Sequence, residues 1–445
     1  ELVGIEEEQS KLYLARFKDF SHLYSGVCSC CSQCADICPI FAKAPEGFIG
    51  RSEAAPVFKR ALAIALENGD LGELKKDPMF DKVFDMCLLC GQCTWKCPTS
   101  ASMIDMIGRI RSEKRNRILP PVIEFVMKHR FIYNATLRTA GTFQFLWRNP
   151  LSRVVLAIMP QKLLGTHIPK DRYLPKFARA SIQKRFPKMY NLSAAQAEIA
   201  FFYGCSSDMF AEPIIESFVK IARANGLDVA FPALRCCGEP FAAAGNIEEY
   251  FRLARYNLDL LGDYRYIVSH CPTCGLAFKE YAKNFARIHD NEYEEKATRV
   301  AAKFYDPARL VFEKIAPNGL KAGNKVFRRK VAVHLSCHEK LGHKLSTTVN
   351  KTDSFLKRIP GVEVVPMAGA DDCCGLGGPW GLGKHYDISV ELRRDKISNI
   401  MKSGADVVTS WCLGCMFQMR DGLMQAGSTI KVKHPFELLA DTYHQ

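Results

Sequence analysis

Cys373-Cys374-Gly375 is the centre of a five-cysteine pattern that occurs twice in this 445-residue chain. Cys337 precedes the pair, and Cys412-Leu413-Gly414-Cys415 follows it. The two copies together use ten of the 19 cysteines, so we infer that each set of thiols serves a common binding site. The earlier copy has the same order and consists of Cys205, Cys236-Cys237-Gly238 and Cys271-Pro272-Thr273-Cys274.

Five thiols in this order favour a multi-iron cluster over simpler centres. A structural zinc takes four ligands in a tetrahedron, which leaves one cysteine over in each copy. A disulfide between adjacent cysteines is strained, because the preferred Cα separation exceeds one peptide step. In a multi-iron cluster, neighbouring thiolates can bind neighbouring irons. Zinc in at least one copy, and redox-active thiols alone, stay open as alternatives.

The N-terminal part contains a second repeated motif, Cys-x-x-Cys-x-x-Cys-x-x-x-Cys-Pro. This spacing is typical of bacterial two-cluster ferredoxins, in which the fourth cysteine of each run binds the other cluster, and it is far less typical of a zinc ribbon. Cys30 falls outside the motif, and we interpret it as a small packed residue. The expected ligands of one 4Fe-4S cubane are Cys28, Cys31, Cys34 and Cys97, and those of the other are Cys87, Cys90, Cys93 and Cys38.

From Glu198 onward, short apolar strands alternate with helical patterns, and each cysteine group follows the end of a strand. In open α/β sheets this edge binds ligands beside helix N-termini, which favour anions such as thiolate-rich clusters. We expect residues 282–326 to be charged and helical and to separate the two copies. Strands are expected at 199–203, 228–231, 266–270, 330–335, 362–365 and 406–411, and helices at 213–224 and 247–261.

The formal net charge of +14 is concentrated in one stretch. Residues 109–188 contain 18 Lys and Arg but only three Asp and Glu. This stretch is broken by prolines, so we expect short helices and extended pieces that form either a solvated linker or a docking surface for an anionic membrane face or a membrane subunit. No nucleic-acid-binding motif accompanies the charge, and no apolar run reaches the roughly 20 residues that span a bilayer. The acidic residues 1–10 lack the apolar core of a signal peptide, which predicts a reducing, cytoplasmic location.

The order Cys, Cys-Cys-Gly, Cys-x-x-Cys resembles the CCG domain of heterodisulfide reductases. The whole chain resembles the D-type subunit of that family, and also the iron–sulfur subunits of anaerobic glycerol-3-phosphate dehydrogenase and glycolate oxidase. The resemblance implies a noncubane 4Fe-4S cluster with five cysteine ligands in each complete set, although one site with zinc or no metal stays open. The implied ligands are Cys205, Cys236, Cys237, Cys271 and Cys274 for one cluster, and Cys337, Cys373, Cys374, Cys412 and Cys415 for the other.

The predicted fold is α+β and multidomain. We expect a helical ferredoxin-type domain with two 4Fe-4S clusters over 1–115 and a basic connecting or docking segment over 116–195. Two α/β CCG domains related by pseudo-twofold symmetry follow over 196–325 and 326–445.

The predicted function is that of an iron–sulfur electron-transfer subunit in a membrane-associated anaerobic redox complex. By resemblance, electrons pass between the ferredoxin-type clusters and the noncubane clusters for disulfide and thiol chemistry. The alternative is a noncatalytic relay between a dehydrogenase or cytochrome partner and the quinone pool. Expected partners are a membrane-embedded cytochrome or quinone-reactive subunit, or a flavoprotein dehydrogenase subunit, in a hetero-oligomer on the cytoplasmic side of the membrane.

Two histidines adjoin the cysteine groups, His270 before Cys271 and His338 after Cys337. Either side chain can serve simply in capping or packing. His338 also matches a Cys-His pair of the related families, and the ordinary pKa of histidine suits proton transfer near neutral pH. His338 is therefore our candidate for the catalytic group that protonates a departing thiolate.

Overall fold

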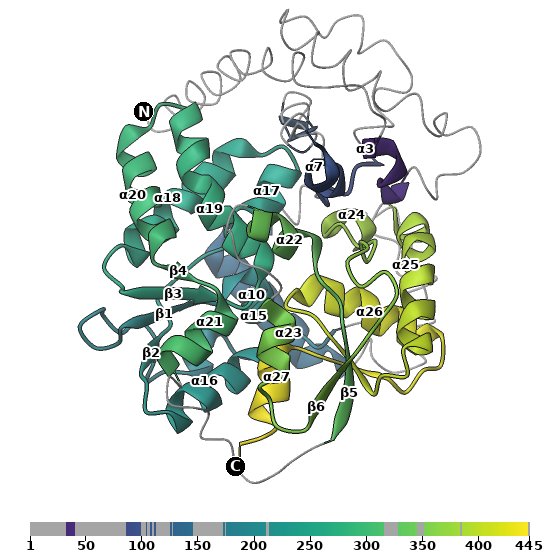
Figure 1. The fold of residues 1–445 in the computed structure, drawn as a ribbon. Coiled ribbons are helices and arrows are strands. Elements are labelled where there is room, and N and C mark those ends of the chain that lie inside the picture. The colour runs from purple at the N-terminus through teal and green to yellow at the C-terminus, as the bar shows by residue number, and fades with distance from the viewer. Residues whose placement is uncertain are drawn as a thin grey trace, which may run out of the picture.

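The computed structural model of the chain describes residues 33–40, 86–98, 104, 107–108, 111–112, 125–126, 128–145, 172–173, 175–210, 213–315, 328–344, 351–382 and 385–443. Two four-stranded sheets form its centre, and all the strand pairs within them are parallel (Figure 1). The first sheet has the order β2-β1-β3-β4 and the second the order β6-β5-β7-β8. This shared order confirms the predicted α/β duplication, while the pseudo-twofold relation stays a prediction.

The first α/β domain places a fully buried strand at its centre. The Ile-Ala-Phe-Phe sequence of β1 is apolar throughout because helices cover both faces of a parallel sheet. Its strands are β1 Ile199–Phe202, β2 Val229–Ala230, β3 Tyr266–Ser269 and β4 Phe304–Tyr305. Its helices are α15 Gly204–Met209, α16 Ile214–Ala224, α17 Glu239–Ala243, α18 Ile247–Leu261, α19 Pro272–Arg287, α20 Asn291–Ala302 and α21 Pro307–Leu310, followed by the π-helical turn η3 Val311–Ile315.

The second α/β domain repeats this plan and ends in a well-capped helix. The His434 side chain accepts from the backbone of Phe436, and Glu437 accepts from the backbone of His434, which closes a capping box at the start of α27. The strands are β5 Arg329–Val333, β6 Val362–Val365, β7 Val407–Thr409 and β8 Lys431–Lys433. The helices are α22 Cys337–Lys344, α23 Lys351–Leu356, α24 Pro379–Leu382, α25 Tyr386–Lys402, α26 Leu413–Gln425 and α27 Pro435–Ala440.

Two edge strands correct the sequence prediction. Strand β4 lies within residues 282–326, which we expected to be helical, and β8 was not predicted. Each has only two or three residues and gains its place by pairing, Ile267 with Phe304 and Val407 with Lys431. Such short strands carry no periodic pattern of their own, because the pairing partner is distant in sequence.

One continuous hydrophobic core runs through both α/β domains. The C-terminal helix α27 returns to pack on α16 of the first domain, where the Phe218 and Phe436 rings lie 5.0 Å apart. The Lys220 Nζ donates to the carbonyls of Ala440 and Tyr443 at 3.1 and 2.9 Å. These contacts fix the two sheets relative to each other.

The described part of the basic stretch contains a longer helix than expected, α10 Arg130–Phe143, followed by the short α14 Ile182–Arg185. One face of α10 is buried through Tyr133 and Leu137, and the Tyr133 hydroxyl donates to the Cys205 carbonyl at 3.2 Å. The Arg138 guanidinium donates to the carbonyls of Ala178 and Asp208, both at 2.9 Å, so this charge is used inside the protein. Among the described helices, none combines the length and apolar character needed to cross a membrane.

The described parts of the N-terminal cysteine runs contain two short helices, α3 Gln33–Asp36 and α7 Gln92–Lys96. They pack against each other, and α7 also packs on α22 of the second α/β domain (Figure 1). Cys28, Cys30 and Cys31 lie outside the described residues.

Candidate metal centre

Each set of five cysteines converges at the carboxyl edge of its sheet. The ten side chains are all thiols, and in both sets the contacts between neighbouring thiols follow the same path. The Cys374 and Cys415 sulfurs, for example, lie 3.4 Å apart. The paths are Cys205–Cys236–Cys237–Cys274–Cys271 and Cys337–Cys373–Cys374–Cys415–Cys412.

Helix N-termini lie against one cysteine of each set. Cys271 is the N-cap of α19 and Cys412 is the N-cap of α26. The pKa of Cys271 is lowered by hydrogen bonding from Cys274 and by the amides at the start of α19, and Cys412 has the equivalent partners in Cys415 and the amides of α26. Each amide group favours the negative charge of a thiolate.

A glycine after each cysteine pair lets the chain turn tightly around the sulfur. Gly238 and Gly375 have φ angles of 90° and 83°, which side-chain-bearing residues rarely adopt. Their amides face the sulfurs of Cys236 and Cys373 at 3.5 and 3.4 Å. A Cβ at Gly375 would lie 2.6 Å from the Cβ of Leu392, so there is no room for a side chain.

The second cysteine set meets the N-terminal cysteine runs. The Cys90 thiol hydrogen-bonds with Cys373, and both pack with Cys38 against a small hydrophobic cluster that includes Trp380. Cys38 and Cys90 belong to different runs but were predicted to share one cubane, and the structure brings them to the same place.

Thiol donors, backbone amides and burial together fit iron–sulfur clusters. Residues 199–279 and 331–420 match the family described as a cysteine-rich domain, CCG, and residues 27–102 match the family described as a 4Fe-4S dicluster domain. This is a CCG-domain iron–sulfur protein. The predicted resemblance is thereby confirmed at the level of its domains, and we call the sets that contain Cys205 and Cys337 the first and second CCG sites.

Curated relatives match just over half of the chain. Lactate utilization protein A of Shouchella clausii is 28% identical over 245 residues, which are 54% of this chain and 98% of the relative. Lactate utilization protein A 1 of Bacillus mycoides is 26% identical over 249 residues, or 56% of this chain and 98% of the relative. Lactate utilization protein A of Geobacillus kaustophilus is 27% identical over 246 residues, which are 54% of this chain and 98% of the relative. About half of this chain therefore matches almost the full length of these relatives.

One thiol of each CCG site ionises most readily. Hydrogen bonds from Cys337, Cys374 and Cys90 hold the pKa of Cys373 well below its usual range. In the first CCG site, Cys236 and Cys274 lower the pKa of Cys237 to about 7. Because thiolates are the metal-binding form, a lowered pKa suits these two sulfurs to metal binding.

His338 joins three cysteine motifs. Its Nδ1 lies 2.7 Å from the Thr273 hydroxyl, inside the Cys271–Cys274 motif, and its Nε2 lies 3.4 Å from the Leu89 carbonyl, between Cys87 and Cys90. A carbonyl can only accept, so Nε2 carries the hydrogen and Nδ1 accepts from Thr273. Burial lowers the pKa of His338, which keeps the ring neutral. Its role as a proton donor stays a prediction.

His270 has a packing role in the first CCG domain. Its Nε2 hydrogen-bonds with the Ser207 hydroxyl at 2.8 Å, and its ring stacks on Phe201 with a centroid distance of 5.9 Å. Burial lowers the pKa of His270 to about 4, so the ring is neutral at physiological pH. This agrees with the structural interpretation of the sequence.

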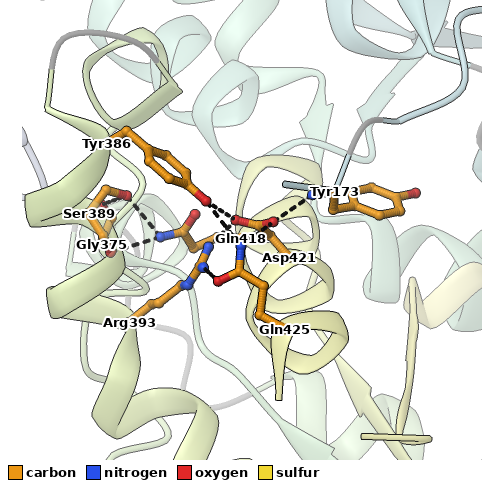
Figure 2. Close-up of polar contacts among 8 residues, drawn as sticks. All are labelled: Tyr173, Gly375, Tyr386, Ser389, Arg393, Gln418, Asp421 and Gln425. Atoms are coloured by element: carbon orange, nitrogen blue, oxygen red, sulfur yellow. Dashed lines mark hydrogen bonds and ion pairs between the residues drawn. The ribbon is translucent and has the colours of Figure 1, made fainter. Parts of the chain in front are cut away.

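A buried polar network supports the second CCG site from behind (Figure 2). The Ser389 hydroxyl donates to the Gly375 carbonyl at 2.8 Å, and Gln418 donates to that hydroxyl at 2.9 Å. Arg393 forms a buried ion pair with Asp421, whose carboxylate also accepts from the Tyr173 amide at 2.6 Å. Helices α25 and α26 and the connecting segment are thus held together behind one cysteine pair.

Sequence reasoning missed three side chains beside the second CCG site. His334 lies with Cys374 and Cys415 in a buried group, and the ammonium groups of Lys340 and Lys396 are near enough to lower the pKa of His334, after burial, which has the larger effect. His334 occupies the position that Phe202 holds in the first copy, three residues before the first cysteine. A residue-by-residue comparison of the two copies would have drawn attention to it.

Proposed function

We propose that this protein is an iron–sulfur electron-transfer subunit in which ferredoxin-type clusters exchange electrons with two CCG clusters. When bound, such clusters supply one-electron transfer. The proposed set is two cubane clusters on the N-terminal runs and one noncubane cluster at each CCG site. The chain contributes buried thiolates, amide dipoles and the spacing between the centres.

The contact between Cys90 and Cys373 carries this proposal. It brings a predicted cubane ligand directly against a predicted ligand of the second CCG site, which gives a short path between the two kinds of centre. Arg111 reinforces the junction, because its guanidinium donates to the Cys87 carbonyl at 2.7 Å and to the Ala243 carbonyl of the first α/β domain at 3.1 Å.

A more specific proposal is that the two CCG sites together carry out disulfide chemistry. Reduction of a disulfide takes two electrons and two protons and gives two thiols. The charge of Cys412 raises the pKa of Cys271, so a thiol of one CCG site lies near a thiol of the other, and one disulfide substrate between them is the proposed arrangement. Released thiolates are soft ligands that iron sites accept, and His338 is the proposed proton donor once its neutral ring has taken up a proton.

A second candidate is a relay that carries electrons from the oxidation of a hydroxy acid toward the quinone pool. The names of the matching relatives, lactate utilization protein A, favour it. In that case a flavoprotein dehydrogenase or membrane cytochrome would do the chemistry, and the CCG pair would only transfer electrons.

Electron paramagnetic resonance distinguishes the two candidates. Disulfide chemistry predicts that added thiol, under oxidising conditions, produces a paramagnetic signal in the wild type that changes in Cys236→Ser and Cys373→Ser. If no thiol-dependent signal arises in any of the three while the iron clusters are present, the relay is correct and disulfide chemistry is not.

We also propose that helix α10 rests on an anionic membrane surface. Four phenylalanines in or beside this helix are exposed, including Phe131 at 86% and Phe145 at 61%, and they lie in the stretch that holds most of the excess positive charge. Exposed aromatic and basic residues together suit the lipid headgroup boundary.

Vesicle flotation tests this docking. The wild type should float with vesicles that contain phosphatidylserine, less so at high salt, and should not float with purely zwitterionic vesicles. The double substitution Phe131→Ser and Phe145→Ser should abolish flotation, while Met424→Ser, at another exposed apolar side chain, should not. Unchanged flotation of the double variant would contradict the proposal.

A further inference from the structure

His334 is an unusual side chain for a protein interior. It is only 1% exposed, and neither ring nitrogen has a hydrogen-bond partner among the described residues. Leaving a buried polar group without a partner is destabilising, so native structures rarely keep one without a ligand or water. One ring nitrogen lies within 4.8 Å of the sulfurs of Cys374 and Cys415, which also lie within that distance of each other.

The first CCG site has a different side chain at this position. Phe202 and His334 each precede the first cysteine of their set by three residues. The strand registers agree, since Phe201 pairs with Val268 as Val333 pairs with Thr409. The Phe202 ring is buried and packs edge-on against Phe278 at 4.9 Å, so this position offers only carbon to the first site.

We propose that His334 binds metal at the second CCG site through a ring nitrogen, beside the thiolates of Cys374 and Cys415. This assignment rests on the proposed iron–sulfur function. Imidazole nitrogen and thiolate sulfur together suit iron and zinc. The first CCG site has thiolate ligands alone, so the duplicated sites are chemically different.

A neighbouring carbonyl completes the surroundings that a metal-bound histidine needs. Such a ring usually donates its second N–H to a carboxylate or carbonyl. The Ala370 carbonyl is near enough to influence the His334 pKa but makes no hydrogen bond in the present geometry. This carbonyl already accepts from the Leu335 amide at 3.0 Å, and its second lone pair is left for the ring nitrogen that does not bind metal.

The expected consequence is an ordering of reduction potentials. If the His334 imidazole takes the place of one of the five thiolates on iron, the cluster becomes less negative and its potential rises, as in Rieske centres. The second CCG site should then have a higher potential than the first. This ordering would favour electrons at the site next to Cys90.

Nitrogen hyperfine spectroscopy tests the assignment on the anaerobically purified full chain labelled with ¹⁵N-histidine. A directly bound histidine nitrogen should appear in the wild type and disappear in His334→Phe, which copies Phe202 of the first site. His334→Cys should keep the metal content while losing the nitrogen coupling. His434→Asn is the matched control, because His434 is also buried but the same spectrum should remain. If the second site holds zinc, X-ray absorption at the zinc edge should show one nitrogen in the wild type and none in His334→Cys.

The outcomes separate this inference from the broader proposal. Bound and reducible clusters without histidine nitrogen coupling, and without a nitrogen ligand on any zinc, would overturn the role of His334 and leave the electron-transfer function intact. A coupling that survives in His334→Phe would also overturn it. Absence of reducible iron from the wild type would instead contradict the proposed function itself.

Discussion

The two CCG sites share one backbone plan but have different surroundings. In the first site, aromatic and amide side chains hold the cysteine pair, because the Tyr281 hydroxyl donates to the Cys237 carbonyl at 2.5 Å and Asn257 donates to the Cys236 carbonyl at 2.9 Å. In the second site, the pair is supported by Ser389 and the Arg393–Asp421 ion pair.

This difference shows which parts of a duplicated site are constrained. The strand ends, the helix N-termini and the glycine after each cysteine pair are the same because the thiols must converge. The residues behind the thiols are not bound by that requirement, and they differ in charge and polarity. The second site has Cys90 of the N-terminal runs against its Cys373, so we expect it to be the entry point for electrons from those runs.

The largest expected effect concerns the order in which electrons reach the two CCG sites. Cys373→Ser should prevent fast reduction of the first CCG site by a donor that reduces the N-terminal clusters. Cys236→Ser should leave reduction of the second site as fast as in the wild type, because that site lies before the first one on the path. Freeze-quench paramagnetic resonance measures both rates. If both variants slowed the reduction of the second site severely and equally, the proposed order would be wrong.

A second test compares the supports of the two sites. Asp421→Ala should lower the free energy of unfolding by about 3–5 kcal/mol, because it leaves the buried Arg393 charge without its partner. Tyr281→Phe at the first site should lower it by roughly 1 kcal/mol, the usual contribution of one hydrogen bond.

Chemical denaturation under anaerobic conditions measures both changes, with the exposed pair Arg265–Glu198 as a control. Arg265→Ala should leave the free energy of unfolding nearly unchanged, because both side chains of this pair face solvent. If Asp421→Ala cost no more than the control, the network behind the second site would not be supporting it.

The sequence predicted the cysteine positions well because their spacing follows directly from the β/α alternation. Each thiol group follows a strand, and parallel strands bring their carboxyl ends to one edge. It could not predict the contact between Cys90 and Cys373, which joins distant segments. The basic count also overestimated how much of the positive charge faces solvent, because Arg111, Arg138 and Arg172 are largely used for internal contacts. His334 was missed because a single buried histidine has no local pattern.

Two charges should adjust the potentials of the two sites in opposite directions. Lys396 is near enough to Cys373 and Cys374 for their charges to raise its pKa, although burial lowers it overall. Lys396→Met should lower the potential of the second CCG site by some tens of millivolts and leave the first unchanged, because it removes a positive charge beside one site only. Potentiometric titration followed by paramagnetic resonance measures both, and an equal shift at both sites would contradict the local effect.

The smallest expected effect is a pH dependence at the first site. Burial, and then the charge of Glu280, raise the pKa of Glu239 to about 7, and Glu239 lies near enough to affect Cys237. As pH rises through about 7 this carboxyl becomes negative, so the potential of the first site should fall. Glu239→Gln should remove that part of the pH dependence. Titrations at pH 6 and pH 8 provide the check, and an unchanged slope in the variant would assign it to another group.

Anaerobic metal analysis of the purified full chain tests the central claim, that both CCG sites are iron–sulfur centres beside a two-cluster domain. Four clusters of four irons predict about 16 iron atoms per chain. About 12 iron atoms with one zinc would mean that zinc takes the place of the cluster at one CCG site. A value near 8, with no zinc, would mean that only the N-terminal cubanes exist, and it would contradict the account.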